Sequence, residues 1–221
     1  MNFIVLDCET CPVDVEMTDV MPSNMFYYDL GWLVVNEFGE VLTEKSFVNA
    51  DIFLHEKALM TSAYYADKIP QYWEDIKVGK RILAKSYNIR KALLNDIRNF
   101  EIENVFAHNM RFDFGALNNT QRWLTKSKHR RFLPYSVEIC DTLKMARKVL
   151  GHDEDYRQFC WDNGFITKNN QIQMKAETIY RYLSQNVEFE ESHTGLEDCM
   201  IEKEILLYCL PFMSLEDARL W

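Results

Sequence analysis

Two acidic residues, Asp7 and Glu9, stand together at the end of an apolar run near the start of the chain. Residues 3–8 are almost continuously apolar, which is typical of a buried central strand. Because side chains alternate along a strand, Asp7 and Glu9 share one face and repel each other unless a cation is present. Mg²⁺ prefers carboxylates together with water and phosphate. Acids are also common at strand ends, so this pair alone fits either a metal site or an ordinary strand end.

Two further polar groups come later in the chain. The segment 107–113 (AHNMRFD) directly follows a short apolar run, and loops at strand ends are where α/β folds place their chemistry. Its last residue, Asp113, also fits an acid in the first turn of a helix. His193 stands near the start of a strongly apolar helical segment, and Asp198 follows five residues on. Both side chains face one cleft if that helix crosses the sheet, whereas an exposed imidazole is the plain alternative for His193.

Strands and helices must bring these groups together. Apolar, β-branched or aromatic runs predict strands at 3–8, 27–36, 41–48, 104–107 and 138–140. Helical spacing covers 52–100, 114–124, 142–150, 156–163, 175–184 and 193–209, with Asp141 as the N-cap of the third of these helices and Gly151 just past its end. This order predicts an α/β fold with a mixed sheet of about five strands and helices on both faces. The whole chain, 1–221, is expected to form one domain.

Composition limits the classes of function. The 221 residues are 48% hydrophobic with only 7 Gly and 5 Pro, which excludes a disordered or collagenous chain. The net charge, 25 − 34 = −9, means that any nucleic-acid binding must be local. The first residues lack a signal-peptide pattern, and no apolar run approaches the ~20 residues that span a bilayer. We therefore expect a soluble, cytoplasmic protein with no membrane partner, whose six cysteines are reduced thiols.

Taken in order, the three polar groups resemble the motifs of the DEDD superfamily of 3′→5′ exonucleases. The resemblance is to the histidine-containing (DEDDh) branch, which includes polymerase proofreading subunits and oligoribonucleases. Asp7, Glu9 and Thr10 match the first motif, an apolar strand followed by Asp-x-Glu-Thr. The second motif is matched by His108, Asn109, Phe112, Asp113 and Leu117, and the third by His193 and Asp198. The match spans about residues 3 to 209, nearly the whole chain.

The sequence departs from the family pattern after the first motif. Thr10 is followed by Cys11-Pro12, where the family often has Thr-Gly, and the stretch up to residue 27 is long and rich in methionine (Met17, Met21 and Met25). This departure concerns how the terminal nucleotide is gripped rather than the metal chemistry. The helical segment 52–100 matches no family element closely, and we expect it to shape the substrate channel.

The resemblance implies an RNase H-like fold and a two-metal-ion phosphodiester hydrolase. Asp7, Glu9 and Asp198 would coordinate one Mg²⁺ or Mn²⁺, Asp7 would bridge to a second, and Asp113 would hold that ion directly or through water. His193 would be the general base for the attacking water, because imidazole titrates near neutral pH. The product would be a nucleoside 5′-monophosphate. Four converging carboxylates would also repel a phosphodiester unless two dications balanced them.

A nucleic-acid strand would need a local binding surface. One dense basic run is interleaved with aromatic residues: Arg122, Lys126, Lys128, His129, Arg130 and Arg131, with Trp123 and Phe132. Phosphate attraction and base stacking hold single strands in this way, although a solvated loop explains the run equally well. Lys144, Arg147 and Lys148 are weaker candidates. The resemblance adds Thr10, His108, Asn109 and Phe112 as substrate-binding positions.

Two other functions fit parts of this pattern. The main alternative is a catalytically silent nucleic-acid-binding module, or a polymerase-associated adaptor, on the same fold. A set of mutually repelling acids argues against it, since a binding module has no use for them. RNase H-type or resolvase endonucleases also cluster acids around two metals, but the histidine five residues before the last Asp favours the exonuclease. The sequence leaves open whether the substrate is single-stranded DNA or RNA and whether a polymerase is a partner.

Overall fold

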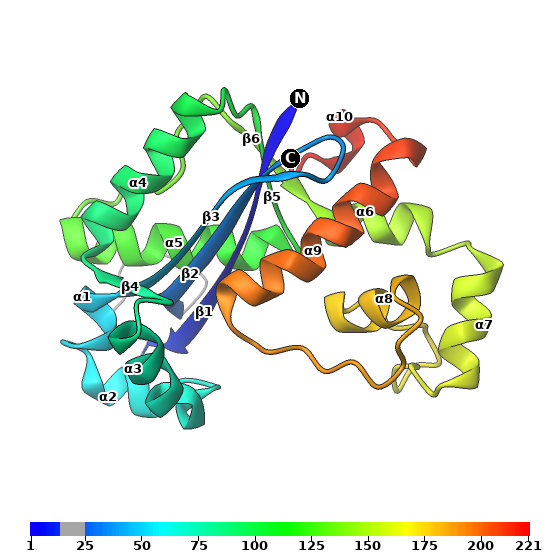
Figure 1. The fold of residues 1–221 in the computed structure, drawn as a ribbon, viewed down its shortest axis with the longest axis horizontal. Coiled ribbons are helices and arrows are strands. Elements are labelled where there is room, and N and C mark those ends of the chain that lie inside the picture. Colours follow the sequence, from blue (N-terminus) through cyan, green and yellow to red (C-terminus); the bar gives the residue numbers. More distant parts are fainter. Residues whose placement is uncertain (14–24) are drawn as a thin grey trace.

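The computed structural model of the chain describes residues 1–13 and 25–221, so Met17 and Met21 lie outside the described residues. Its centre is a six-stranded sheet in the order β4-β3-β2-β1-β5-β6 (Figure 1). The strands are β1 (Asn2–Pro12), β2 (Met25–Asn36), β3 (Val41–Asn49), β4 (Ile82–Ala84), β5 (Asn104–Ala107) and β6 (Glu138–Asp141). The prediction of a mixed sheet is confirmed, with one strand more than expected.

Strand directions bring the ends of three strands to one edge of the sheet. β2 is antiparallel to both of its neighbours, β1 and β3. The pairs β1–β5, β5–β6 and β3–β4 are all parallel. The carboxyl ends of β1, β5 and β6 therefore open at the same edge, where open α/β sheets bind their ligands.

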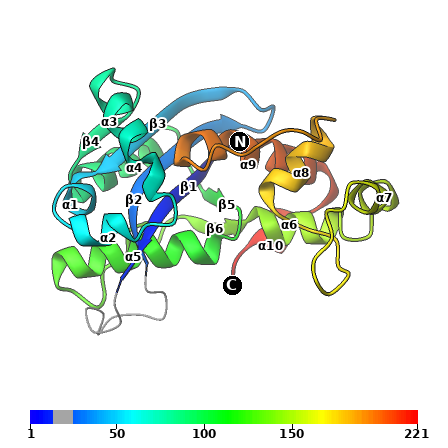
Figure 2. The same ribbon diagram turned by 90° about the horizontal axis from the view of Figure 1, so that it is seen from below.

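Helices cover both faces of the sheet, as Figures 1 and 2 show. The main helices are α4 (Ser86–Asn99), α5 (Met110–Thr125), α6 (Thr142–Val149), α7 (Glu154–Asp162), α8 (Ala176–Leu183) and α9 (Gly195–Cys209). Along β1, Ile4 and Leu6 belong to the core packed against α4 and α5, whereas Phe3 and Val5 belong to the core with α6, α8 and α9. The alternation of side chains along β1 thus serves two separate cores.

The prediction of a helical segment over 52–100 is partly wrong. It contains α1 (Ala50–Phe53), α2 (Lys57–Thr61), the 3₁₀ turn η2 (Ala66–Lys68) and α3 (Ile69–Lys77) before β4 and α4. Ile82 and Leu83, which fit the helical spacing, instead form β4 and pair with β3. A three-residue apolar run fits both the helical and the strand periodicity. Gly79, with a left-handed backbone (φ +77°), separates α3 from this run.

Other element boundaries shift at the places where the chemistry was expected. Asp141 caps α6 by accepting a hydrogen bond from the Leu143 N–H, as predicted. However, α5 begins at Met110 rather than at residue 114, and α9 begins at Gly195, so His193 precedes that helix. The chain ends with η3 (Leu210–Phe212) and α10 (Leu215–Ala218). All six cysteines are free and buried, as expected. Within the described residues, no helix combines the length and apolar character needed to cross a membrane.

Candidate active site

Three carboxylates meet where α9 starts against the sheet. Asp7 and Glu9 extend from β1, and Asp198 extends from the first turn of α9. One oxygen from each lies within 4.8 Å of the others, close enough for all three to hold one cation. The pairing of β1 with β2 shifts register between Glu9 and Thr10, an irregularity of the kind often found next to active sites.

Two glycines let α9 approach β1 and β2 this closely. A Cβ on Gly31 would lie 2.2 Å from the backbone nitrogen of Leu196, and one on Gly195 would lie 2.8 Å from the carbonyl oxygen of Asp7. Neither contact is possible for a real side chain, so backbone packs directly on backbone here. The first turn of α9, which carries Asp198, is fixed against the strand that carries Asp7.

A buried ion-pair network anchors the same helix start. Asp29 of β2, which is fully buried, accepts a hydrogen bond from the Gly195 N–H through Oδ2 (3.0 Å). The buried Arg81 lies 3.4 Å from that oxygen through Nη1 and 2.8 Å from Glu197 Oε2 through Nη2. Arg81 Nε also donates to Asp75 Oδ2 (2.9 Å). One guanidinium therefore connects β2, α3 and the first turn of α9.

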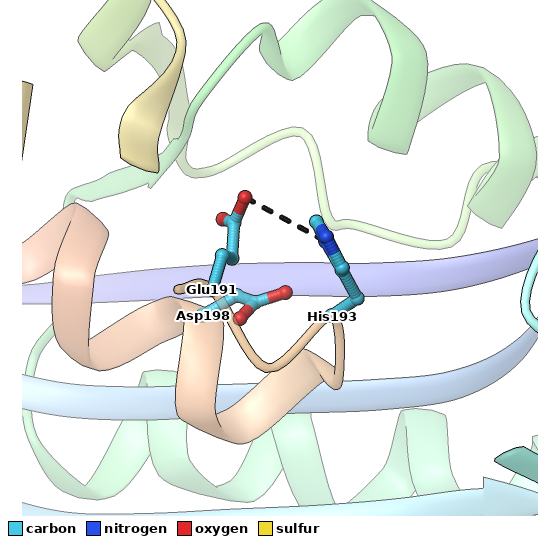
Figure 3. Close-up of side chains that lie close together, drawn as sticks. All are labelled: Glu191, His193 and Asp198. Carbon is cyan, nitrogen blue, oxygen red and sulfur yellow. Dashed lines mark ion pairs between the residues drawn. The ribbon is translucent and has the colours of Figure 1, made fainter. Parts of the chain in front are cut away.

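His193 stands in the loop that leads into α9, with a left-handed backbone (φ +50°). Its Nδ1 lies 3.6 Å from Glu191 Oε2, and Asp198 lies beside both (Figure 3). Burial and the nearby Lys68 lower the pKa of His193 below its ordinary value. The imidazole is therefore neutral at pH 7, the form in which it accepts a proton.

Asp113, on the first turn of α5, approaches from the other side of β1. Its Oδ1 accepts hydrogen bonds from the Cys8 N–H and the Cys8 thiol, both at 3.2 Å. One cavity of about 350 Å³ is lined by all five predicted catalytic residues: Asp7, Glu9, Asp113, His193 and Asp198. The structure thus brings together the acids and the histidine that the three motifs single out.

The carboxyl groups of this cavity resist ionisation. Burial raises the pKa of Asp7 well above its usual range, and the neighbouring Asp113 raises it further. Burial and Asp198 raise the pKa of Glu9 to about 9, and burial and Glu191 raise that of Asp198 to about 8. Burial also raises the pKa of Asp113 to about 7, although its bonds from Cys8 act in the opposite direction. A cluster of this kind ionises fully only when positive charge enters it.

Several solved structures resemble this chain. No protein-family model and no curated protein sequence matches the chain. Exonuclease X, solved in complex with 5′-overhanging duplex DNA, matches with a TM-score of 0.50 and 15% identity over 98% of this chain and 97% of its own. The nuclease domain of 3′hExo, a DEDDh family member bound to rAMP, gives a TM-score of 0.57 and 11% identity over 95% and 92%. The chain has the fold of the DEDDh exonucleases. Exonuclease I from Methylocaldum szegediense matches with a TM-score of 0.53 and 12% identity. That match covers 96% of this chain but only 41% of the longer Exonuclease I chain.

The cavity of this DEDDh fold suits hard divalent cations. Its donors are carboxylate oxygens, the ligand type that Mg²⁺ and Mn²⁺ prefer. The raised pKa values of Asp7, Glu9 and Asp198 indicate a deficit of positive charge. Lys68 lowers the pKa of Glu9 and of Asp198, but burial outweighs it in both. The residues present therefore fit the metal ions that the fold implies.

The residues expected to bind substrate fall into two groups. Thr10 and the half-exposed Phe112 line the cavity and are free to touch a ligand. His108 lines it too, but Nδ1 bonds to Thr142 Oγ1 (3.1 Å) and Nε2 to the Met174 carbonyl (2.8 Å). Both ring nitrogens of His108 are thus already hydrogen-bonded within the protein and are not free to bind a substrate. Asn109 borders an adjoining cavity of about 800 Å³.

The basic run lies apart from these two cavities. Arg122 is about 14 Å along α5 from Asp113, and none of the described residues that line the cavities belongs to the run. Several residues of the basic run already contact other groups of this chain. Arg122 Nε donates to the Arg130 carbonyl (3.1 Å), Lys126 Nζ lies 3.5 Å from the Trp123 ring centre, and Arg131 stacks on Tyr135.

Several residues of this site are not marked, or are marked only weakly, in the sequence. The larger cavity is lined by Arg147, a weaker candidate, and by Lys168 and Lys175, which no motif contains. Tyr65 and Glu191 line both cavities. Glu191 was not predicted, although its position two residues before His193 was a signal. Nothing in the local sequence of Tyr65 or Lys168 marks a site, because long-range packing places them there.

Proposed function

We propose that this protein is a metal-dependent 3′→5′ exonuclease that removes nucleoside 5′-monophosphates from single-stranded DNA or RNA ends. The observation that carries the proposal is the cluster of Asp7, Glu9 and Asp198 oxygens within 4.8 Å, in a cavity shared with His193. The DEDDh fold supports the same conclusion, because Exonuclease X and 3′hExo, two neighbours that this chain matches over more than 90% of their length, are both nucleases.

Each acidic residue has a role in holding the metal ions. Asp7, Glu9 and Asp198 would hold one divalent cation, and Asp7 with Asp113 would hold a second. Two such ions would supply positive charge for both the attacking and the leaving oxygen of an in-line phosphoryl displacement. Asp113 keeps its position because the Cys8 N–H and thiol both donate to its Oδ1.

His193 would act as the general base. Its lowered pKa keeps the imidazole neutral and able to take the proton of the attacking water. Glu191, 3.6 Å away, would stabilise the imidazolium that forms. The ring of Tyr65 packs flat against the imidazole and limits its rotation.

The substrate would enter through the larger cavity. Arg147, Lys168 and Lys175 line it beside Asp7 and His193, and they provide the positive charge that a phosphate backbone needs. Exonuclease X is described bound to DNA and 3′hExo bound to rAMP, which supports a nucleic-acid substrate of either sugar. The proposed activity does not require a polymerase partner.

Digestion of 5′-labelled DNA and RNA oligonucleotides tests the proposal. With Mg²⁺ or Mn²⁺, we expect a ladder that shortens from the 3′ end, abolished by EDTA and by Asp7→Asn. Glu190→Gln, which removes an exposed acid, is the matched control and should retain activity. Cleavage of a circular single strand would indicate an endonuclease instead. Tight binding without any cleavage would support the adaptor function.

A further inference from the structure

Glu202 is a buried acid that none of the three motifs contains. It lies on α9, one turn after Asp198, so the two side chains emerge on the same face of the helix. Only 3% of Glu202 is exposed. It borders the larger cavity together with Asp7, His108 and His193. The charge of Glu202 helps to raise the pKa of Asp7, and the charges of Asp113 and Asp198 help to raise that of Glu202, so Glu202 lies near the same group of carboxylates.

The carboxylate of Glu202 has a backbone hydrogen-bond donor, but within the part of the chain that the structure describes its Oε2 has none. The carboxylate accepts a hydrogen bond from the backbone N–H of His108, which ties α9 to the turn between β5 and α5. Oε2 is buried and has no hydrogen-bond partner among the described residues. A buried carboxylate oxygen without a partner is costly, so an orphan of this kind calls for a cation or a water held by one.

We propose that Glu202 is a fifth carboxylate of the metal centre, which holds the cation shared by Asp7 and Asp113 directly or through a coordinated water. This role rests on the proposed metal-dependent function and extends its ligand set beyond the four motif acids. Metal binding satisfies the orphan oxygen and balances a fifth negative charge in the cavity. The bond to the His108 N–H fixes the carboxylate in place for that purpose.

The competing explanation is that Glu202 only connects α9 to the β5–α5 turn through His108. Two variants separate these explanations. In Glu202→Gln, an amide oxygen still accepts the His108 N–H, but the negative charge is gone. In Glu202→Asp, the charge stays and the shorter side chain weakens the connection. If Glu202 is a metal ligand, Glu202→Gln should bind the cation more weakly than Glu202→Asp. If Glu202 is only a structural connection, Glu202→Asp should bind the cation more weakly.

Calorimetric titration of the full-length protein with Mn²⁺ provides the test, with electron paramagnetic resonance to count bound ions. We expect the wild type to bind two ions and Glu202→Gln to weaken the second about 10- to 100-fold while keeping the first. Glu202→Asp should weaken it less. Glu204→Gln, on the same helix with a half-exposed side chain that lines neither cavity of the site, is the matched control and should bind like the wild type.

The outcomes are distinguishable. Two wild-type binding events with both affinities unchanged in Glu202→Gln would overturn the role of Glu202 and leave the proposed function intact. A wild-type protein that binds no Mn²⁺ would overturn the metal-dependent function and this role with it. Melting temperatures in EDTA show whether each variant folds. If Glu202→Gln does not fold, Glu202→Asp decides: weaker binding of the second ion at an unchanged melting temperature would support the role, and unchanged binding of that ion would overturn it.

Discussion

The ring of Tyr65 lies almost parallel to the ring of His193, with ring centres 4.5 Å apart and an interplanar angle of 13°. Tyr65 directly precedes η2, and Lys68, the last residue of η2, donates from Nζ to the carbonyl of Ser192. A part of the chain that matches no element of the DEDDh motifs therefore holds the loop that carries the proposed base. Tyr64 and Tyr65 thus line the smaller cavity, while a role of the segment 52–100 in a substrate channel stays a prediction.

Tyr65→Ala should lower kcat about 10-fold or more, since a base held out of position loses part of its ~10²- to 10⁴-fold contribution. It should also change the pH profile. Burial lowers the pKa of His193, so exposing the ring raises that pKa toward its ordinary value and moves the loss of activity at acid pH to higher pH. Tyr65→Phe keeps the stacked ring and should behave like the wild type. An unchanged profile in Tyr65→Ala would mean that the contact does not position the base.

Asp198→Asn should lose about 100-fold or more of the activity, because it removes a carboxylate that the proposed mechanism needs for charge stabilisation. The same change should raise the melting temperature of the metal-free protein. Burial and neighbouring acids raise the pKa of Asp198 to about 8, so folding at neutral pH must protonate this carboxyl, a cost that the neutral Asn side chain avoids. Nuclease assays and thermal melts in EDTA measure the two effects, with Glu190→Gln as the control. A lower melting temperature would show that Asp198 is mainly structural.

The metal-free protein should become less stable as the pH rises from 5 to 9. The pKa values of Asp113, Asp198 and Glu9 are raised by burial to about 7, 8 and 9, so the folded state binds more protons than the unfolded state. Their stabilising contribution is complete below the unfolded values near 4 and is lost as the pH passes the folded values. Mn²⁺ should restore stability at pH 8 to 9, because it replaces the protons. Melting temperatures across this range, with and without Mn²⁺, test this; a flat profile in EDTA would contradict it.

Arg81→Ala should reduce the free energy of unfolding by about 3 to 5 kcal/mol, because it leaves Asp29 as a buried, unpaired charge. Lys80→Ala is the matched control. Its half-exposed ion pair with Glu197, at 2.7 Å, should contribute at most about 1 kcal/mol. Urea unfolding measures both changes. Adding Asp29→Asn to Arg81→Ala should recover part of the loss. Equal effects of the two single substitutions would show that the network is not required.

Local sequence predicted the parts of the site that local physics determines. The apolar run before Asp7, the Asp141 cap and the five-residue spacing from His193 to Asp198 all depend on neighbours in the chain, and the predicted catalytic residues line one cavity. Strand β4 and the start of α9 were misplaced because short apolar runs fit two periodicities and because Thr194, in an extended conformation, is the true N-cap. Tyr65, Arg81 and Glu202 could not be found this way, since their roles come from contacts more than 50 residues apart in sequence.

The two basic regions should affect substrates of different length. Arg147 lines the cavity beside Asp7, whereas Lys128 belongs to the basic run beyond the far end of α5 and is not among the described residues that line either cavity. Arg147→Ala should therefore weaken kcat/KM on a dinucleotide and on a long oligonucleotide alike, because both place a phosphate in the cavity.

Lys128→Ala should act only on the long oligonucleotide, through KM, and should reduce the dependence of binding on salt by about one phosphate contact. Steady-state kinetics on both substrates at two salt concentrations separate the cases. If Lys128→Ala leaves KM for the long substrate unchanged, the basic run is a solvated surface and the strand leaves the cavity in another direction.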